Sequence, residues 1–292
     1  MDKIEFKDLK LGSNISFNNK ARIIDLKNGE VVKIFNMAIF GKLKLCGYDL
    51  EGKILDAKKL ESVPEIIVPN KAVYENGSFV GYTMNKAKGE NFNDVDEKYT
   101  LYERSDLRRY VTEFSQLEDI IKRGNKEGIV FPDFATCDNI YLTNKGKFSL
   151  IDYDGLQVGN HEAICISTSL GDEHQYVNKK YMADDKLYTS QLDIKSLIVL
   201  FFLSAFNVNL GKIGTRAFDG PITLDYVFNQ IGLDDDAIKH KVWKLFQDNI
   251  DNEFLGDDIW NLVNKYKMIA KRGSEVSPYL PNDVYVKKLV RK

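Results

Sequence analysis

The sequence predicts an α+β protein whose first third is mostly β-sheet and whose remainder is mostly helical. Short β-favouring runs broken by turn signals fill Ile4–Phe35 and Ile66–Met84. Further along, residues 101–124 place apolar side chains at spacings of three and four, which defines one buried helix face. The run 194–206 is apolar nearly all round, which is typical of a helix buried on all sides.

A polar connector divides these two patterns. After Met84 the sequence becomes Asn85-Lys86-Ala87-Lys88-Gly89, a composition typical of a boundary between compact parts. We therefore expect an N-terminal part at residues 1–84, a hinge at 85–89 and a helical C-terminal part at 90–292.

Composition excludes several classes of function. The net charge of -2, from 41 basic and 43 acidic residues, argues against a nucleic-acid or membrane-surface binder, which would carry a basic stripe. Cys46, Cys137 and Cys165 are widely spaced and have no histidine cluster beside them, so we expect no zinc site. The low, odd cysteine count and the polar N-terminus favour a cytoplasmic protein.

The first clear hairpin joins Lys20–Leu26 to Glu30–Phe35 through Lys27-Asn28-Gly29. Its second strand places a single lysine, Lys33, among apolar neighbours. A buried lysine needs a charged or polar partner. The alternative is a lysine that faces outward from a half-exposed strand, because side chains alternate between the two faces.

A short helix is expected at about 48–60, with an apolar stripe formed by Leu50, Ile54 and Leu55. Glu51 follows Lys33 by 18 positions, a distance that lets a strand–helix connection bring the carboxylate back to the amine. Two more strands, at 66–74 and 79–84, complete the sheet.

The stretch Gly128–Gly155 predicts a second hairpin, with strands Asn139–Thr143 and Lys147–Ile151 joined by a turn that contains Gly146. Carboxylates and an amide stand at the ends of its strands: Asp133, Asp138, Asn139, Asp152 and Asp154. Because a hairpin brings its ends together, these oxygens can form a site for Mg²⁺, which takes one or two carboxylates and shares its shell with water and phosphate. The alternative is that they are turn residues that cap the hairpin.

With this order of elements the sequence resembles the protein kinase family, in its bacterial branch, over about Leu9 to Tyr266. Val31-Val32-Lys33-Ile34 is similar to the family's third-strand lysine motif, which implies that Lys33 contacts the phosphates of ATP and that Glu51 is its helix partner. The resemblance further implies a two-lobe fold, with a five-stranded antiparallel sheet and one helix in the first lobe.

The remaining site residues are implied by the same resemblance. Asp133 matches the catalytic base, and Asp193 matches the buried aspartate that opens a central helix and holds the catalytic loop. Asn139 and Asp152, 13 positions apart as in the family, match the two Mg²⁺ ligands. The positions that match nucleotide-binding residues are Gly12, Val31, Lys33, Met84, Lys86, Ala87, Tyr141 and Ile151.

The sequence also departs from the family pattern. The stretch Leu11–Phe17 keeps one glycine, Gly12, where the family has three. Asp133 lies one position further from Asn139 than in the family, and no lysine stands between them, so Asp138 is a second candidate for the base. Val31 and Tyr141 are larger than the usual residues around the adenine, which predicts a tighter nucleotide pocket.

The leading interpretation is an ATP- and Mg²⁺-dependent phosphotransferase that acts on a protein Ser or Thr, with no nucleic-acid or membrane partner. The degraded glycine-rich and catalytic loops favour one alternative, a pseudokinase scaffold that binds nucleotide or a protein partner without transferring phosphate. A third interpretation is a small-molecule kinase on the same fold.

Overall fold

The computed structural model describes residues 1–17, 20–58, 60–92, 107–134, 137–164, 187–206, 210, 225–229 and 235–247. The chain forms two compact units. Unit 1 contains Met1–Phe92, Lys122–Phe131 and Asp138–Cys165, and unit 2 contains Asn93–Ile121, Pro132–Cys137 and Ile166–Lys292. The hinge expected at residues 85–89 thus lies inside the first continuous segment of unit 1.

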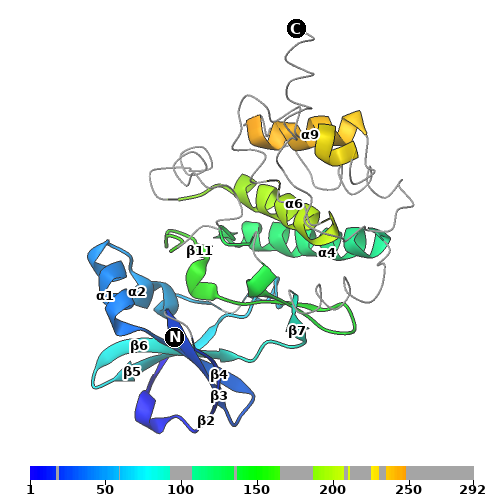
Figure 1. Ribbon diagram of the computed structural model, residues 1–292. Helices are drawn as coiled ribbons and strands as arrows, with labels where there is room; N and C mark the ends of the chain where they lie inside the picture. The colour runs from blue at the N-terminus through cyan, green and yellow to red at the C-terminus, as the bar shows by residue number, and fades with distance from the viewer. Residues whose placement is uncertain are drawn as a thin grey trace. The chain divides into compact units, whose positions relative to one another are not determined.

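A six-stranded sheet is the main element of unit 1 (Figure 1). In spatial order its strands are β1 (Asp2–Glu5), β5 (Pro69–Glu75), β6 (Ser78–Asn85), β4 (Glu30–Phe35), β3 (Ala21–Leu26) and β2 (Leu11–Phe17). The sheet and the helices described below confirm the α+β class.

The expected five-stranded antiparallel sheet is wrong in one respect, because β1 adds a sixth strand that runs parallel to β5. Its register runs from Asp2 opposite Lys71 to Glu5 opposite Tyr74. The local sequence Asp-Lys-Ile-Glu is short and mostly charged, so it carries little strand signal of its own. The strand forms because main-chain groups of β5 are available to pair with it.

The two faces of the sheet bury different side chains. On one face, branched aliphatic residues of four strands form a cluster with Phe6 and Leu9 at its edge: Ile24, Leu26, Val32, Val73 and Val80. On the other, the ring of Phe35 lies 6.1 Å from that of Phe79 and 6.0 Å from that of Tyr82. Lys33 belongs to this aromatic face.

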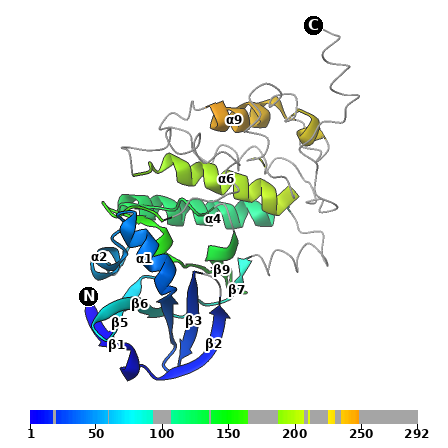
Figure 2. The same ribbon diagram turned by 60° about the vertical axis from the view of Figure 1, so that its left-hand side comes forward.

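Two short helices cover the aromatic face (Figures 1 and 2). The first is α1 (Met37–Leu45), which was not predicted; Asn36 caps it by accepting a hydrogen bond from Ala38 N, and Phe40 stacks on Phe35. The second is α2 (Leu50–Leu55), which is shorter than the expected helix at 48–60. It begins where the side chain of Asp49 accepts from Gly52 N at 2.9 Å.

The predicted hairpin is confirmed. Strand β9 (Ile140–Leu142) pairs with β10 (Phe148–Leu150), and the turn between them has Gly146 at a φ of 71°. A third strand, β7 (Glu90–Asn91), pairs with the free edge of β9. Nearby, β8 (Ile129–Val130) pairs with β11 (Gln157–Val158). Two short 3₁₀ turns flank the hairpin: η2 (Cys137–Asn139) precedes β9 and η3 (Tyr153–Gly155) follows β10. Another 3₁₀ turn, η1 (Phe6–Asp8), connects β1 to β2.

The hairpin is tied to the large sheet by the residues that precede β5. The carbonyl of Leu150 accepts from Ile67 N and its amide donates to Glu65 O, both at 2.8 Å. These bonds hold the end of β10 against unit 1's first segment. Whatever follows β10 therefore has a fixed starting point beside the sheet.

Unit 2 is helical in the part that the structure describes. It holds most of α4 (Leu107–Lys126), all of α6 (Gln191–Phe206) and α9 (Asp236–Gln247). Helices α4 and α6 lie side by side in both views, with Phe114 against Phe201 at 5.3 Å (Figures 1 and 2). Residues 195–202 are buried, which confirms the prediction of a helix enclosed on all sides. The helix expected at 257–271 lies outside the described residues.

Among the described helices, none combines the length and the apolar character that crossing a bilayer requires.

Gly81 provides a test of how closely the strands must approach. It pairs with Ile34, and a Cβ at this position would lie 2.0 Å from the carbonyl oxygen of Lys33. We expect Gly81→Ala to lower the free energy of unfolding by about 1–3 kcal/mol or more, because β6 and β4 would have to separate. Urea unfolding followed by circular dichroism measures the change.

Gly41 is the matched control, since it lies within α1 and a Cβ there meets no atom within 4 Å. Gly41→Ala should leave stability unchanged or raise it by about 0.5–1 kcal/mol through helix propensity. Equal effects of the two substitutions would contradict the close approach at Gly81.

Candidate active site

A buried charged cluster in unit 1 is centred on Lys33. From β4 its Nζ donates to Asp154 Oδ1 at 2.7 Å and Oδ2 at 2.9 Å, and it also donates to Asp152 Oδ1. Lys33 is 9% exposed. The amine therefore has the charged partners that burial requires, and the alternative of an outward-facing lysine is wrong.

The chain reverses after β10 to bring both carboxylates to this amine. Asp152 has a φ of 69°, in the left-handed region, and η3 begins directly after it. Gly155 leaves room for the turn, because a Cβ there would lie 2.8 Å from Asp152 Oδ2. The two carboxylates differ in environment: the side chain of Asp152 is 29% exposed and that of Asp154 is 9% exposed.

Tyr82 is the third side chain of the cluster. It is opposite Lys33 in the β4–β6 register, so the two side chains lie on the same face of the sheet. The phenol is fully buried and donates to Asp154 Oδ1 at 2.5 Å. One carboxylate oxygen of Asp154 thus accepts from both Lys33 and Tyr82.

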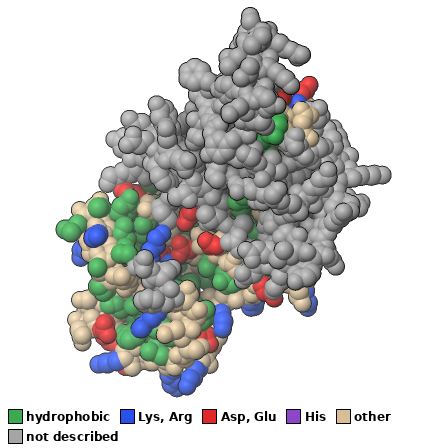
Figure 3. Space-filling model, in the orientation of Figure 1, with side chains coloured by type: hydrophobic (Ala, Val, Ile, Leu, Met, Phe, Trp, Pro, Cys, Tyr) green, Lys and Arg blue, Asp and Glu red, His purple; other side chains and the backbone are tan. Residues whose placement is uncertain are grey.

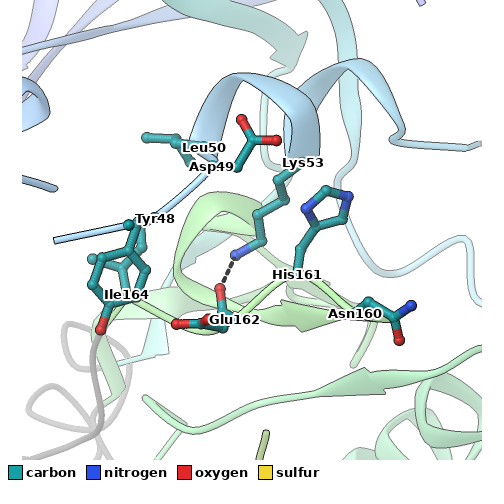
Figure 4. Close-up of a pocket in the computed structure, with 9 residues that line it drawn as sticks. Tyr48, Asp49, Leu50, Lys53, Asn160, His161, Glu162 and Ile164 are labelled. Atoms are coloured by element: carbon teal, nitrogen blue, oxygen red, sulfur yellow. Dashed lines mark hydrogen bonds between the residues drawn. The ribbon is translucent and has the colours of Figure 1, made fainter. Parts of the chain in front are cut away.

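Lys53 binds the main chain of Asp154. Its Nζ donates to the carbonyl oxygens of Asp154 at 2.8 Å and Glu162 at 2.9 Å, and the residue is 2% exposed. Figure 4 shows the side chain reaching from α2 to the segment that contains Glu162. The side chain and the carbonyl of Asp154 are therefore both bound by buried cations.

The charges explain the direction of each pKa shift. Burial by itself would lower the pKa of the Lys33 amine, but the negative charges of Asp154 and Asp152 outweigh it and raise that pKa. Burial would likewise raise the pKa of the Asp154 carboxyl, yet the charge of Lys33 and the bonds from Lys33 and Tyr82 lower it. Burial, and then the charge of Asp154, raise the pKa of the Tyr82 phenol. At neutral pH the cluster is thus an ammonium held by carboxylates, with a neutral phenol beside it.

The expected ion pair between Lys33 and Glu51 is wrong. In the described structure the Glu51 carboxylate accepts from the Tyr74 hydroxyl at 2.8 Å, and Lys33 binds Asp152 and Asp154 instead. The buried face of α2 carries Leu50, Lys53 and Ile54. Glu51 follows Leu50 directly, so its side chain is turned about 100° round the helix axis from that of Leu50, towards Tyr74 of β5.

The main chain of Asn139 lies beside the residue that precedes Asp152, as expected for a hairpin. The amide of Ile151 donates to Asn139 O at 3.0 Å, which places the residue before β9 beside the end of β10. The side chain of Asp138 is exposed, while its carbonyl accepts from Asn91 at 2.8 Å. In the part of the chain that the structure describes, three or more His, Cys, Asp or Glu side chains nowhere gather closely enough to hold a metal by themselves.

Several of the expected nucleotide-binding residues lie together on the face of Lys33. Val31 is opposite Met84, directly beside the pair formed by Lys33 and Tyr82. At the same end of the sheet, Lys86 Nζ lies 3.3 Å from Asp25 Oδ1, and a Cβ at Gly12 would lie 3.0 Å from Asp25 O. Ala87, Tyr141 and Ile151 are half-buried.

Tyr141 lies on the less buried face of the small sheet. Its neighbours along β9, Ile140 and Leu142, are buried on the other face, and it stands opposite Ser149 and Asn91, which are half-buried. The ring therefore shares its face with polar side chains.

Asp133 and Asp193 belong to unit 2. Asp133 is half-buried on the turn after β8, and Asp193 is fully buried in the first turn of α6, as predicted. The hydrogen bonds expected between Asp193 and the backbone of Phe131–Asp133 stay a prediction.

A pocket of about 270 Å³ opens at the start of α2 (Figure 4). It is lined by Gly47, Tyr48, Asp49, Leu50, Lys53, Asn160, His161, Glu162 and Ile164. His161 Nε2 lies 3.0 Å from Asp56 Oδ2, which ties the end of α2 to the turn after β11. Lys53 is shared by this pocket and the Lys33 cluster.

Charged side chains of both signs lie on the face of unit 1 seen in Figure 3. Acidic side chains gather near the middle of that view, and Lys and Arg side chains lie along its lower edge.

Sequence reasoning missed the roles of Asp154, Tyr82 and Lys53. The signal for Lys53 was present, because it lies three positions after Leu50 and next to Ile54, on the buried stripe of the helix. Asp154 was recognised as a carboxylate at the hairpin end but was given no partner. For Tyr82 the signal is the strand register opposite Lys33, which the local sequence does not contain.

The chain matches no protein-family model, and a search of curated proteins finds no match.

Replacing Lys33 tests how much the Lys33 cluster contributes to the free energy of unfolding. Lys33→Met should lower the free energy of unfolding by about 3–5 kcal/mol, because it removes the cation that pairs with the buried Asp154 carboxylate. Chemical denaturation monitored by circular dichroism measures this loss.

Lys239 in α9 is the control, since it also bridges two aspartates, at 3.2 Å to Asp225 and 2.9 Å to Asp236. Those carboxylates are 49% and 99% exposed, so Lys239→Met should cost no more than about 1 kcal/mol. A similar loss for both lysines would show that burial of the Lys33 cluster adds nothing.

Proposed function

We propose that this protein is an ATP- and Mg²⁺-dependent phosphotransferase of the protein kinase type, which acts on Ser or Thr of a protein substrate. The observation that carries the proposal is the pairing of a buried strand lysine, Lys33, with carboxylates that directly follow a β-hairpin. A cation that can bind phosphate and a part-exposed carboxylate that can bind its metal lie within one cluster.

The arrangement of the sheet supports the same proposal. Strands β2, β3, β4, β6 and β5 are neighbours in that order, and two helices stand between β4 and β5. The order of these five strands supports the first lobe that the kinase resemblance implies, to which the structure adds the parallel strand β1 and a second helix. We propose that the lobes correspond to residues 1–84 and 90–292, with the hinge at 85–89, and that the protein works in the cytoplasm.

The donor set fits a magnesium ion shared with a nucleotide. Asp152 Oδ2 makes no hydrogen bond to Lys33, the carboxylate is part-exposed, and the amide of Asn139 stands at the neighbouring strand end. One carboxylate and one amide leave positions for water and phosphate oxygens, as Mg²⁺ prefers. When bound, the metal would neutralise charge on the β and γ phosphates.

In this proposal the residues of the protein position the nucleotide and the acceptor hydroxyl and stabilise the charge on the phosphates. Lys33 would bind phosphate oxygens, and its raised pKa keeps it charged. Asp133 would orient the acceptor hydroxyl and take its proton, with Asp138 as the alternative base. The nucleotide base would lie over Val31, Met84 and Tyr141, beside Lys86 and Ala87.

A second candidate function, a scaffold that binds nucleotide or a partner without phosphate transfer, is favoured by one observation. Lys33 does not pair with Glu51, and in this structure its amine is occupied by Asp152 and Asp154. A site whose metal ligand stays bound to the lysine would be unable to carry out the transfer.

Phosphate transfer itself separates the two candidates. With Mg²⁺-ATP the wild-type protein should phosphorylate itself or a generic protein acceptor, as measured with radiolabelled ATP. Asp152→Ala should abolish transfer, and Asp133→Asn should lower its rate by about 10²–10⁴-fold. Asp138→Asn should leave the rate near the wild-type value.

If Asp138→Asn lowers the rate of transfer and Asp133→Asn does not, the catalytic base is Asp138. If the wild-type protein binds nucleotide but transfers no phosphate with any divalent metal, the scaffold function is supported in place of the enzyme.

The size of the nucleotide pocket can be tested at Tyr141. This ring is larger than the aliphatic side chain that the resemblance places beside the adenine, and it lies on the less buried face of β9. Tyr141→Leu should therefore tighten ATP binding, as measured by isothermal titration calorimetry. An unchanged dissociation constant would show that the ring does not border the nucleotide.

A further inference from the structure

We infer that Asp154, in place of a helix carboxylate, holds Lys33 in its phosphate-binding position, and that Asp152 alone of the two aspartates is free to take the metal. The inference rests on the proposed function and assigns each carboxylate of the Asp152-Tyr153-Asp154 segment a separate task.

The hydrogen bonds of Asp154 are the first argument. Both carboxylate oxygens accept from Lys33, at 2.7 and 2.9 Å, and Oδ1 also accepts from Tyr82 at 2.5 Å. The side chain is 9% exposed. Buried donors thus take three of the about four lone-pair positions of this carboxylate, and the Lys33 ammonium would repel a metal ion at the remaining one, which makes Asp154 a poor metal ligand and a good anchor.

Asp152 has the opposite properties. One of its oxygens contacts Lys33, the other lies beside Gly155, and the side chain is 29% exposed. It can therefore exchange Lys33 for a cation while Lys33 keeps its contacts with Asp154. The amine would then lie between an anchor and the phosphate.

The backbone of the anchor is also fixed. Lys53 donates to Asp154 O at 2.8 Å and to Glu162 O at 2.9 Å, so it fastens the segment on both sides of β11. Two positioning residues, Tyr82 from β6 and Lys53 from α2, thus orient Asp154 from different elements. Helix α2 contributes a cation to the segment, and its carboxylate Glu51 is bound to Tyr74.

This arrangement separates the charge that holds Lys33 from the carboxylate of α2. Lys33, Tyr82 and Asp154 lie on β4, β6 and the turn after β10, and α2 reaches Asp154 through Lys53 at its main-chain carbonyl. Neutralising Glu51 should therefore leave Lys33 in place, whereas removing the Asp154 charge should release it.

The pairing can be tested without any ligand, by a double-mutant cycle on the full chain. Denaturant unfolding is measured for Lys33→Met, Asp154→Asn and the double variant. The two single effects should be strongly non-additive, because each removes the same interaction. A second cycle with Lys33→Met and Glu51→Gln should be additive. Additivity in the first cycle with coupling in the second overturns the inference.

The division of tasks is tested by ATP affinity with and without Mg²⁺, measured by calorimetry. Asp154→Asn should weaken binding about 10-fold to 100-fold in both conditions and keep the wild-type enhancement by Mg²⁺. Asp152→Asn should abolish that enhancement. Glu51→Gln should change affinity less than about twofold.

Should Asp154→Asn fail to fold, Tyr82→Phe takes its place, since it removes a single oxygen and should weaken ATP binding with the Mg²⁺ enhancement intact. Wild-type affinity in Asp154→Asn or in this replacement, or loss of the Mg²⁺ enhancement in either, overturns the inference and leaves the proposed function standing. Failure of the wild-type protein to bind ATP in either condition overturns the proposed function, while the stability cycle still decides which carboxylate holds Lys33.

Discussion

The ion pair between Lys33 and Asp154 is the interaction on which the rest of unit 1 depends. Both of its nitrogen–oxygen contacts are buried, and a lysine or an aspartate left alone there would cost several kcal/mol in free energy. Formation of the pair therefore requires β4, β6 and the turn after β10 to be in place together. The site and the fold of this unit share the same contacts.

That requirement explains features of the chain that have no direct chemical role. Gly81 lets β6 approach β4 closely enough for Tyr82 to stand opposite Lys33, and Gly155 lets the chain reverse beside Asp152. The bonds of Leu150 to the residues before β5 fix where the turn begins. Tyr82 then binds the carboxylate of Asp154, and Lys53 binds its main-chain carbonyl. Asp154 in turn fixes the position of the Lys33 amine.

The sequence alone was sufficient where the signal is local. The β9–β10 hairpin, the strand that carries Lys33 and the buried helix at 194–206 could be predicted because turn residues and apolar periodicity lie within a few positions of each other. The partners of the buried charged side chains could not be predicted in this way. The apolar stripe of α2 indicates that Lys53 points inward, but the carbonyl oxygens that accept from its amine belong to Asp154 and Glu162, far along the chain. The sixth strand, parallel to β5, depends likewise on a partner far along the chain.

The central claim is that Lys33 keeps Asp154 as its partner when the site is filled. A crystal structure with Mg²⁺ and a non-hydrolysable ATP analogue tests it most directly. We expect Asp152 to leave Lys33 and bind the metal, while Lys33 contacts phosphate and still donates to Asp154. A complex in which Lys33 pairs with Glu51, or in which Asp154 binds the metal, would contradict this account.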